Sequence, residues 1–328
     1  MVLNIFLFIL GFVLLIIGGN WFVDGASGIA RKLKMPEIII GATIVSIGTT
    51  LPEVMVSASS AFEGHSEIAY GNAIGSIICN TALIAAITMT FRPGKVEKKS
   101  LVVPIIFFFA SAGIYAFVAY FFGTFSRIVG IILLMIFAGY MAYTLISEIK
   151  RSKSGVQEPE PIPEESEPKK EKPVWLNIIL LIVGAAMIAV GSRLLVDNGT
   201  EIAKNVGVPE SVIALTFVAL GTSLPELVTA IIALIKGHSD LSLGNIIGAN
   251  IFNLVLVAGL SITIAPFDVP ASKLVFGHNA SLLIDIPLMF IVMLIMAVPS
   301  IIKGKISRWQ GISLLALYAG FCVFQFVM

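Results

Sequence analysis

Apolar stretches recur along the whole chain and are separated by shorter polar segments. Ten of them are long enough to cross a bilayer, whose hydrocarbon core of about 30 Å takes about 20 helical residues. They cover residues 3–20, 38–61, 68–90, 101–122, 126–148, 174–196, 211–235, 243–265, 278–300 and 308–327. None shows the short alternating pattern of a membrane β-strand. The pattern predicts an all-α integral membrane protein with ten transmembrane helices.

The only clear break in composition lies at residues 150–173, where Pro, Glu and Lys replace apolar residues. Such a segment cannot bury enough apolar surface to fold, so it predicts a disordered linker. It divides the chain into residues 1–149 and residues 174–328, with five predicted helices in each half. Because five is odd, the second half must enter the membrane in the opposite orientation to the first.

The two halves also share a sequence repeat, offset by 173 residues. Its register runs without a gap from Val23, paired with Val196, to Asn80, paired with Asn253. GATIVSIGTTLPE at 41–53 returns as ALTFVALGTSLPE at 214–226. A duplicated chain whose halves have opposite orientation predicts an inverted repeat, the arrangement of many secondary transporters.

Composition and charge restrict the location of the protein. With 57% hydrophobic and 12% charged residues, a soluble domain of 328 residues is excluded. The net charge is only +1, but 17 of the 21 Lys and Arg follow the odd-numbered helices. For a protein of the plasma membrane, the positive-inside rule therefore predicts that both termini are extracellular and that the linker is cytoplasmic. Both cysteines lie in apolar stretches, so we expect no disulfide framework.

The predicted second helix contains the polar sequence GTTLPE at 48–53. Pro52 removes a backbone hydrogen bond, and Gly48 loosens the same stretch, so we expect the helix to break or kink at residues 46–52. The seventh helix repeats the pattern as GTSLPE at 221–226, and we expect a second break there. Carbonyl groups freed within a membrane must be satisfied by protein or by a cavity.

Polar side chains gather around these two breaks. Within about one helical turn lie the oxygens of Thr49, Thr50 and Glu53, and those of Thr222, Ser223 and Glu226. A carboxylate inside a bilayer is costly and indicates a functional site. Asn80 and Asn253, on the third and eighth helices, can add amide oxygens. The set contains oxygen ligands only, which suits Ca²⁺ or Na⁺, and two carboxylates balance one Ca²⁺. For Asp285, in the ninth helix, we expect a structural role.

These motifs resemble the α-repeats of the cation/Ca²⁺ exchanger superfamily, and specifically a compact prokaryotic member of its sodium/calcium exchanger branch. The paired motifs are GTTLPE with GNAIGSIICN (71–80), and GTSLPE with GNIIGANIFN (244–253). The resemblance implies a Ca²⁺ site formed by Glu53, Glu226, Thr49 and Thr222. It implies Na⁺ sites formed by Thr50, Ser76, Ser223 and the backbone carbonyls of Ser46 and Ala219. It also implies alternating access, in which the first and sixth helices slide across the others.

Two departures from the family pattern leave alternatives open. Ala249 stands where relatives often have Ser, and Asn253 stands where some have Asp. Both keep an H⁺/Ca²⁺ antiporter open beside the favoured Na⁺/Ca²⁺ antiporter, and a passive cation channel is a third interpretation. A membrane enzyme would need a nucleophile–base pair or a separate metal centre, and we find neither. We expect no cofactor, no nucleic acid and no obligate protein partner, only the bilayer and the transported cations.

Overall fold

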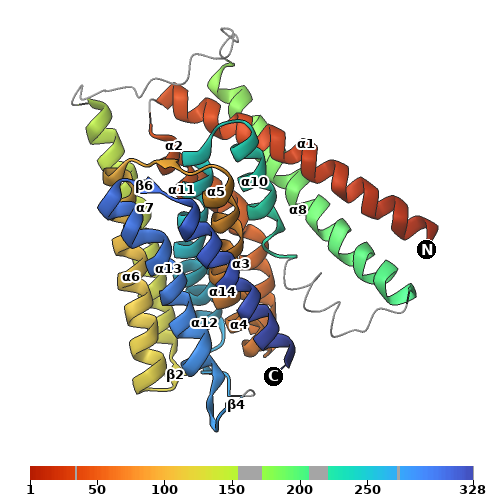
Figure 1. The fold of residues 1–328 in the computed structure, drawn as a ribbon, viewed down its shortest axis with the longest axis vertical. Helices are drawn as coiled ribbons and strands as arrows, with labels where there is room; N and C mark the ends of the chain where they lie inside the picture. The colour runs from red at the N-terminus through yellow and green to blue at the C-terminus, as the bar shows by residue number, and fades with distance from the viewer. Residues whose placement is uncertain (34, 154–171, 207–220, 272–273, 328) are drawn as a thin grey trace.

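The structure is a computed structural model, and it describes residues 1–33, 35–153, 172–206, 221–271 and 274–327. Helices make up almost all of this part (Figure 1). In the first half they are α1 (Val2–Leu33), α2 (Glu37–Ile40), η1 (Gly41–Val45), α3 (Ser46–Phe62), α4 (Ser66–Cys79), η2 (Asn80–Ala85), α5 (Ala86–Phe91), α6 (Lys98–Phe121) and α7 (Arg127–Lys153). In the second half they are α8 (Val174–Asn205), α10 (Leu224–Ile235), α11 (Ser239–Phe252), η4 (Asn253–Val257), α12 (Ala258–Ile264), η5 (Ser281–Asp285), α13 (Ile286–Lys303) and α14 (Arg308–Val327).

The helices confirm the prediction of an all-α membrane protein. In the described part of the chain, eight helical segments are long and apolar enough to cross a membrane. The shorter apolar helix α10 and the C-terminal helix α14 occupy the positions of the expected seventh and tenth helices. The seventh expected helix begins in residues 207–220, which lie outside the described residues, as does most of the expected linker.

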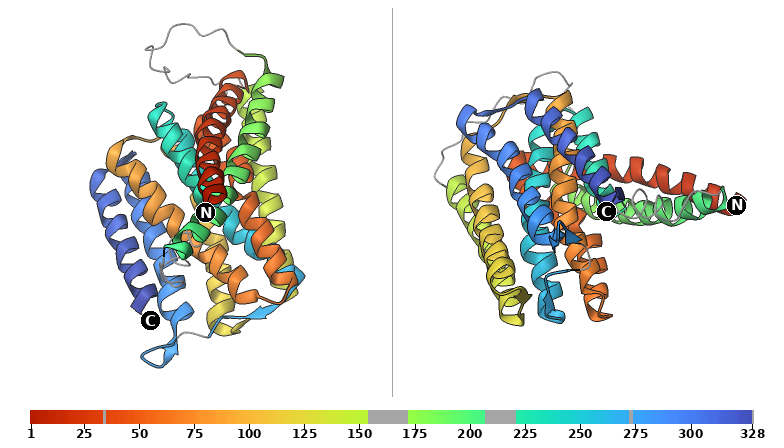
Figure 2. Two further views of the ribbon diagram at one scale, coloured as in Figure 1. Left: turned by 90° about the vertical axis from the view of Figure 1, so that its right-hand side faces the viewer. Right: turned by 60° about the horizontal axis from the view of Figure 1, so that its bottom comes forward.

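The first and sixth helices are longer than the apolar pattern predicts. Helices α1 and α8 have 32 residues each, because both continue through polar segments that the hydropathy pattern places outside the membrane. They pack along each other with their backbones close together. A Cβ atom on Gly11 would lie 2.8 Å from the carbonyl oxygen of Gly191, so a larger residue would separate the pair. The pair extends away from the other helices as a unit (Figures 1 and 2).

The remaining helices form a bundle whose connections meet at two opposite ends. At one end β1 (Gly94–Lys95) pairs with β6 (Lys305–Ile306), which joins the connections after the third and ninth helices. At the other end β2 (Thr124–Phe125) pairs with β3 (Phe267–Asp268), which joins those after the fourth and eighth. Figure 1 labels β6 at the upper end of the bundle and β2 at its lower end, and a hairpin of β4 (Leu274–Val275) and β5 (His278–Asn279) also lies at the lower end. The connections therefore alternate between the ends.

The second helix does not break at residues 46–52, so this part of the expectation is wrong. Residues Glu37–Phe62 form one continuous helical segment, and Pro52 lies inside α3. The irregularity lies earlier, at the π-helical turn η1. A π-helical turn widens the helix by one residue and can absorb strain without interrupting it, and neighbouring helices can compensate for the hydrogen bond that proline removes. In the seventh helix, residues 221–223 form a turn and α10 begins at Leu224.

Candidate cation site

Two carboxylates lie at the centre of the bundle, one from each half of the chain. Glu53 on α3 and Glu226 on α10 are both fully buried, with 0% of their surface exposed. They are close enough to repel each other, and neither carboxylate oxygen of either residue has a hydrogen-bond partner. No basic side chain of the described residues pairs with them. Buried charges without partners are very costly, so this arrangement requires a bound cation or protons.

Hydroxyl groups surround these carboxylates. The side chains of Thr49 and Thr50 lie next to the carboxylate of Glu226, so α3 contributes to the surroundings of both acids. The hydroxyls of Thr50 and Ser223 are buried and have no hydrogen-bond partner. The structure therefore brings Thr49, Thr50 and Glu53 of the first repeat together with Glu226 of the second.

The other expected ligands divide into two groups. Ser46 and Ser76 are buried, at 0% and 4% exposure, and Thr222 is half-buried in the turn before α10. The hydroxyl of Ser46 is occupied, because it donates to the carbonyls of Gly41 at 2.7 Å and Asn245 at 2.9 Å. Only its own carbonyl was expected to bind a cation. Ala219 lies outside the described residues.

The two auxiliary asparagines each begin a π-helical turn. Asn80 is the first residue of η2 and Asn253 the first of η4. Both are fully buried, and none of their amide atoms has a hydrogen-bond partner. Each turn contacts a helix of the other half: η2 of the first half contacts α10, and η4 of the second half contacts α3. Each amide therefore belongs to a turn that borders the carboxylate-bearing helix of the opposite repeat. π-helical turns occur frequently at functional sites, but hydropathy does not reveal them.

A further asparagine supports the site and was not assigned a role from the sequence. Asn245 on α11 is fully buried, and its side-chain oxygen accepts a hydrogen bond of 3.1 Å from the hydroxyl of Thr49. Its repeat counterpart Asn72 instead donates to the carbonyl of Glu53 at 3.2 Å and to the hydroxyl of Ser57 at 2.8 Å. Both asparagines therefore bind α3. Their pairing in the repeat was the available signal, but the sequence did not identify their partners.

Close packing fixes α11 against the second helix. A Cβ atom on Gly244 would overlap the carbonyl of Ile38, and one on Gly248 would overlap the hydroxyl of Ser46. On the equivalent glycines of the first half, Gly71 and Gly75, a Cβ atom would meet no other atom within 4 Å. The spacing of small residues therefore serves helix packing only in the second half.

The site borders the α1–α8 pair. A narrow crevice is lined by Gly48, Thr49, Pro52 and Pro225 on one side and by Ala185, Ile188 and Ala189 of α8 on the other. Both prolines of the duplicated motif face this crevice, so the two motifs and α8 meet at one place. Movement of α8 would therefore change the surroundings of the motif.

Known proteins identify the family. The family described as sodium/calcium exchanger protein matches residues 3–146 and again residues 176–327. The chain belongs to this family. The two matched stretches together include both copies of the carboxylate motif.

Similar proteins match the chain along most of its length. The sodium/calcium exchanger MaX1 of Methanosarcina acetivorans is 30% identical, with 98% of each chain covered. The inner membrane protein YrbG of Escherichia coli is 34% identical, with 88% of each chain covered. The solved structure of the sodium-calcium exchanger NCX_Mj superimposes with a TM-score of 0.77 at 31% identity, covering 97% of each chain. The fold of this exchanger family is therefore shared.

Proposed function

We propose that this protein is an antiporter that exchanges Ca²⁺ for Na⁺ across the plasma membrane by alternating access. The observation that carries the proposal is the pair of fully buried carboxylates, Glu53 and Glu226, without a basic partner among the described residues. Two carboxylates balance one Ca²⁺, and oxygen ligands suit this ion. The names of MaX1 and NCX_Mj, both sodium/calcium exchangers, support the same function.

The proposed ligands follow from the burial and from the family. Ca²⁺ binds between Glu53 and Glu226 with oxygens of Thr49 and Thr222. Na⁺ ions bind in adjoining sites that share these carboxylates, so the two ions exclude each other. The Na⁺ ligands are Thr50, Ser76, Ser223 and the backbone carbonyls of Ser46 and Ala219, with Asn80 and Asn253 as auxiliary groups. Mutual exclusion combined with alternating access produces antiport.

The proposed architecture is an inverted repeat of five helices in each half. Both termini are then extracellular and the linker after α7 is cytoplasmic. The alternation of connections between the two ends of the bundle supports this topology. The pseudo-symmetric halves supply two similar gates around one central site.

Proton coupling is the second candidate, and two residues favour it. Ala249 is fully buried and has no side-chain oxygen to offer Na⁺, and Asn253 offers an amide where a carboxylate would add charge. In this alternative, protons neutralise Glu53 and Glu226 when Ca²⁺ leaves. The two mechanisms use the same carboxylates and differ in the counter-ion.

Transport into proteoliposomes tests the proposal. Purified protein is reconstituted, and uptake of radiolabelled Ca²⁺ is compared under an outward Na⁺ gradient, an outward H⁺ gradient and no gradient. We expect Na⁺-driven uptake that saturates with Ca²⁺ and is absent from Glu226→Gln. Uptake driven by H⁺ alone would replace Na⁺ coupling with the second candidate. Uptake without any gradient would refute antiport and indicate a passive channel.

A further inference from the structure

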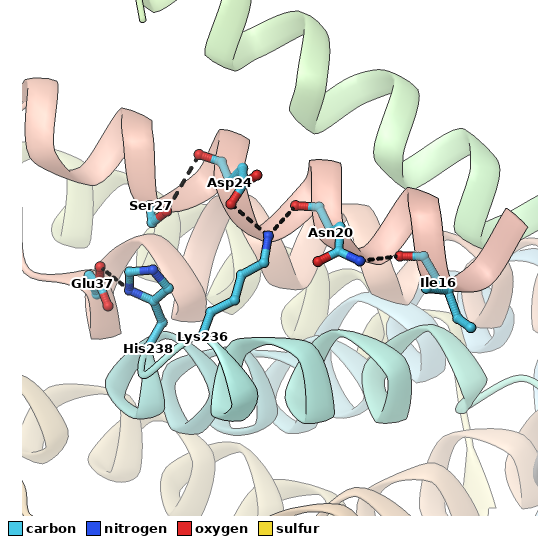
Figure 3. A network of polar contacts seen from close by, with 7 residues as sticks. All are labelled: Ile16, Asn20, Asp24, Ser27, Glu37, Lys236 and His238. Atoms are coloured by element: carbon cyan, nitrogen blue, oxygen red, sulfur yellow. Dashed lines mark hydrogen bonds and ion pairs between the residues drawn. The ribbon is translucent and has the colours of Figure 1, made fainter. Parts of the chain in front are cut away.

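A polar network ties α1 to the connection between α10 and α11 (Figure 3). The ammonium group of Lys236 lies 2.6 Å from a carboxylate oxygen of Asp24 and donates to the carbonyl of Asn20 at 3.0 Å. Next to it, a ring nitrogen of His238 lies 2.8 Å from a carboxylate oxygen of Glu37. Glu37 belongs to α2, so the second contact holds the connection to the bundle, while Lys236 holds α1.

The first half of the chain contains the equivalent connection, between α3 and α4, but its charged residue is acidic instead of basic. Helices α3 and α10 both end at a glycine with positive φ, Gly64 at 83° and Gly237 at 84°. In both turns the glycine N–H donates to the carbonyl three residues earlier, at 3.1 Å and 3.2 Å. The residue before each glycine is therefore presented in the same way. It is Lys236 in the second half and Glu63 in the first.

The helix facing Glu63 in the repeat also carries a changed charge. Asp24 of α1 corresponds to Asp197 of α8 in the repeat register, and the same offset of 173 residues, extended back along these helices, pairs Asn20 with Arg193. Arg193 and Asp197 lie 3.5 Å apart, with 85% and 64% of their side chains exposed. Glu63 is exposed and forms no ion pair with any residue that the structure describes. Of the two equivalent contacts, the described part of the chain therefore contains only one.

We propose that these residues form two alternating latches, of which Lys236–Asp24 holds the state seen here and Glu63–Arg193 holds the opposite state. The proposal rests on the alternating access of the proposed function. In an inverted repeat, the two states exchange the environments of the equivalent helices. When α1 leaves Lys236, α8 approaches the turn that carries Glu63. Arg193, which corresponds to Asn20, is then the residue of α8 that can form an ion pair with Glu63. Asp197, which corresponds to Asp24, would repel Glu63.

The charge difference explains why two separate pairs are needed. A Lys at position 63 would face Arg193 and repel it, and a Glu at position 236 would face Asp24 and repel it. Each latch therefore matches its own helix only. In the Lys236–Asp24 pair the side chains are 24% and 45% exposed, so solvent partly screens their attraction. Loss of one latch should therefore shift the equilibrium between the two conformational states about fivefold.

Cross-linking of the full chain tests the second latch. In a background with Cys79→Ala and Cys322→Ala, one variant carries Glu63→Cys with Arg193→Cys, and a second carries Asp24→Cys with Lys236→Cys. A short bifunctional thiol reagent is added to reconstituted protein. We expect both pairs to cross-link. Adding Lys236→Gln to the first variant should speed its cross-linking about fivefold, whereas Lys95→Gln, on the same end of the bundle, should not.

Absence of cross-linking between positions 63 and 193, while positions 24 and 236 cross-link, would overturn the proposal. An equal rate with and without Lys236→Gln would also overturn it. Charge exchange gives an independent measurement: Glu63→Arg should slow Ca²⁺ exchange, and adding Arg193→Glu should restore it. Wild-type exchange in Glu63→Arg would contradict the latch. Cross-linking requires no ion coupling, so a failure of the proposed antiport leaves this result interpretable, and normal exchange without cross-linking removes the latch alone.

Discussion

Replacing Glu53 with Gln should separate the two effects of the buried carboxylate pair. The substitution keeps the shape of the side chain and removes one negative charge from a fully buried position. Breaking a buried charge pair costs about 3–5 kcal/mol. Because about 1.4 kcal/mol corresponds to a tenfold change, the affinity for Ca²⁺ should fall by a factor of about 10²–10⁴. The same change removes the repulsion with Glu226 when no cation is bound.

Thermal unfolding in detergent with increasing Ca²⁺ measures both effects. At a concentration of 100 Kd, Ca²⁺ stabilises the wild-type protein by about 2.7 kcal/mol. A hundredfold loss of affinity would reduce this gain to about 0.4 kcal/mol at the same concentration. Without Ca²⁺, Glu53→Gln should unfold at a higher temperature than the wild type. The matched control is Glu67→Gln, which removes an exposed carboxylate from α4 and should leave the stabilisation by Ca²⁺ unchanged.

Stabilisation of Glu53→Gln by Ca²⁺ with the wild-type midpoint would refute this prediction. That result would place the cation away from the carboxylate pair. A lower unfolding temperature without Ca²⁺ would show that the two carboxylates do not destabilise the empty protein.

Three further substitutions test the surroundings of the site. Asn245→Ala removes the acceptor of the hydrogen bond from the Thr49 hydroxyl. It should weaken Ca²⁺ binding about threefold to tenfold in a binding titration, which is the range for one buried hydrogen bond. Unchanged affinity would show that Asn245 does not position Thr49. Ala249→Ser adds an oxygen and should increase the Na⁺ affinity in exchange assays, and an unaltered Na⁺ dependence would exclude this position as a ligand. Gly244→Ala should lower the unfolding temperature because the new methyl overlaps the carbonyl of Ile38, whereas Gly71→Ala should not. Equal effects of the two substitutions would show that Gly244 is not packed more tightly than Gly71.

Much of the fold could be predicted from the sequence because it depends on local patterns. The length of an apolar stretch is set by bilayer thickness, so the membrane helices were recognisable one by one. The duplicated Glu53 and Glu226 motifs were recognisable because a carboxylate in an apolar helix is costly anywhere along the chain. The break at Pro52 was wrong because proline removes only one hydrogen bond, and whether the helix continues depends on what surrounds it.

Only the tertiary structure decided which residues meet. The hydroxyl of Thr49 bonds to Asn245, 196 residues away, and Lys236 bonds to Asp24, 212 residues away. Neither partner is implied by local spacing, because such contacts depend on how the two halves intertwine. The repeat made Gly71 and Gly244 equivalent in sequence, but only the second is packed tightly. Sequence thus determined the spans and the carboxylate pair, while packing between distant segments decided the hydrogen bonds, the close contacts and the contact between Lys236 and Asp24.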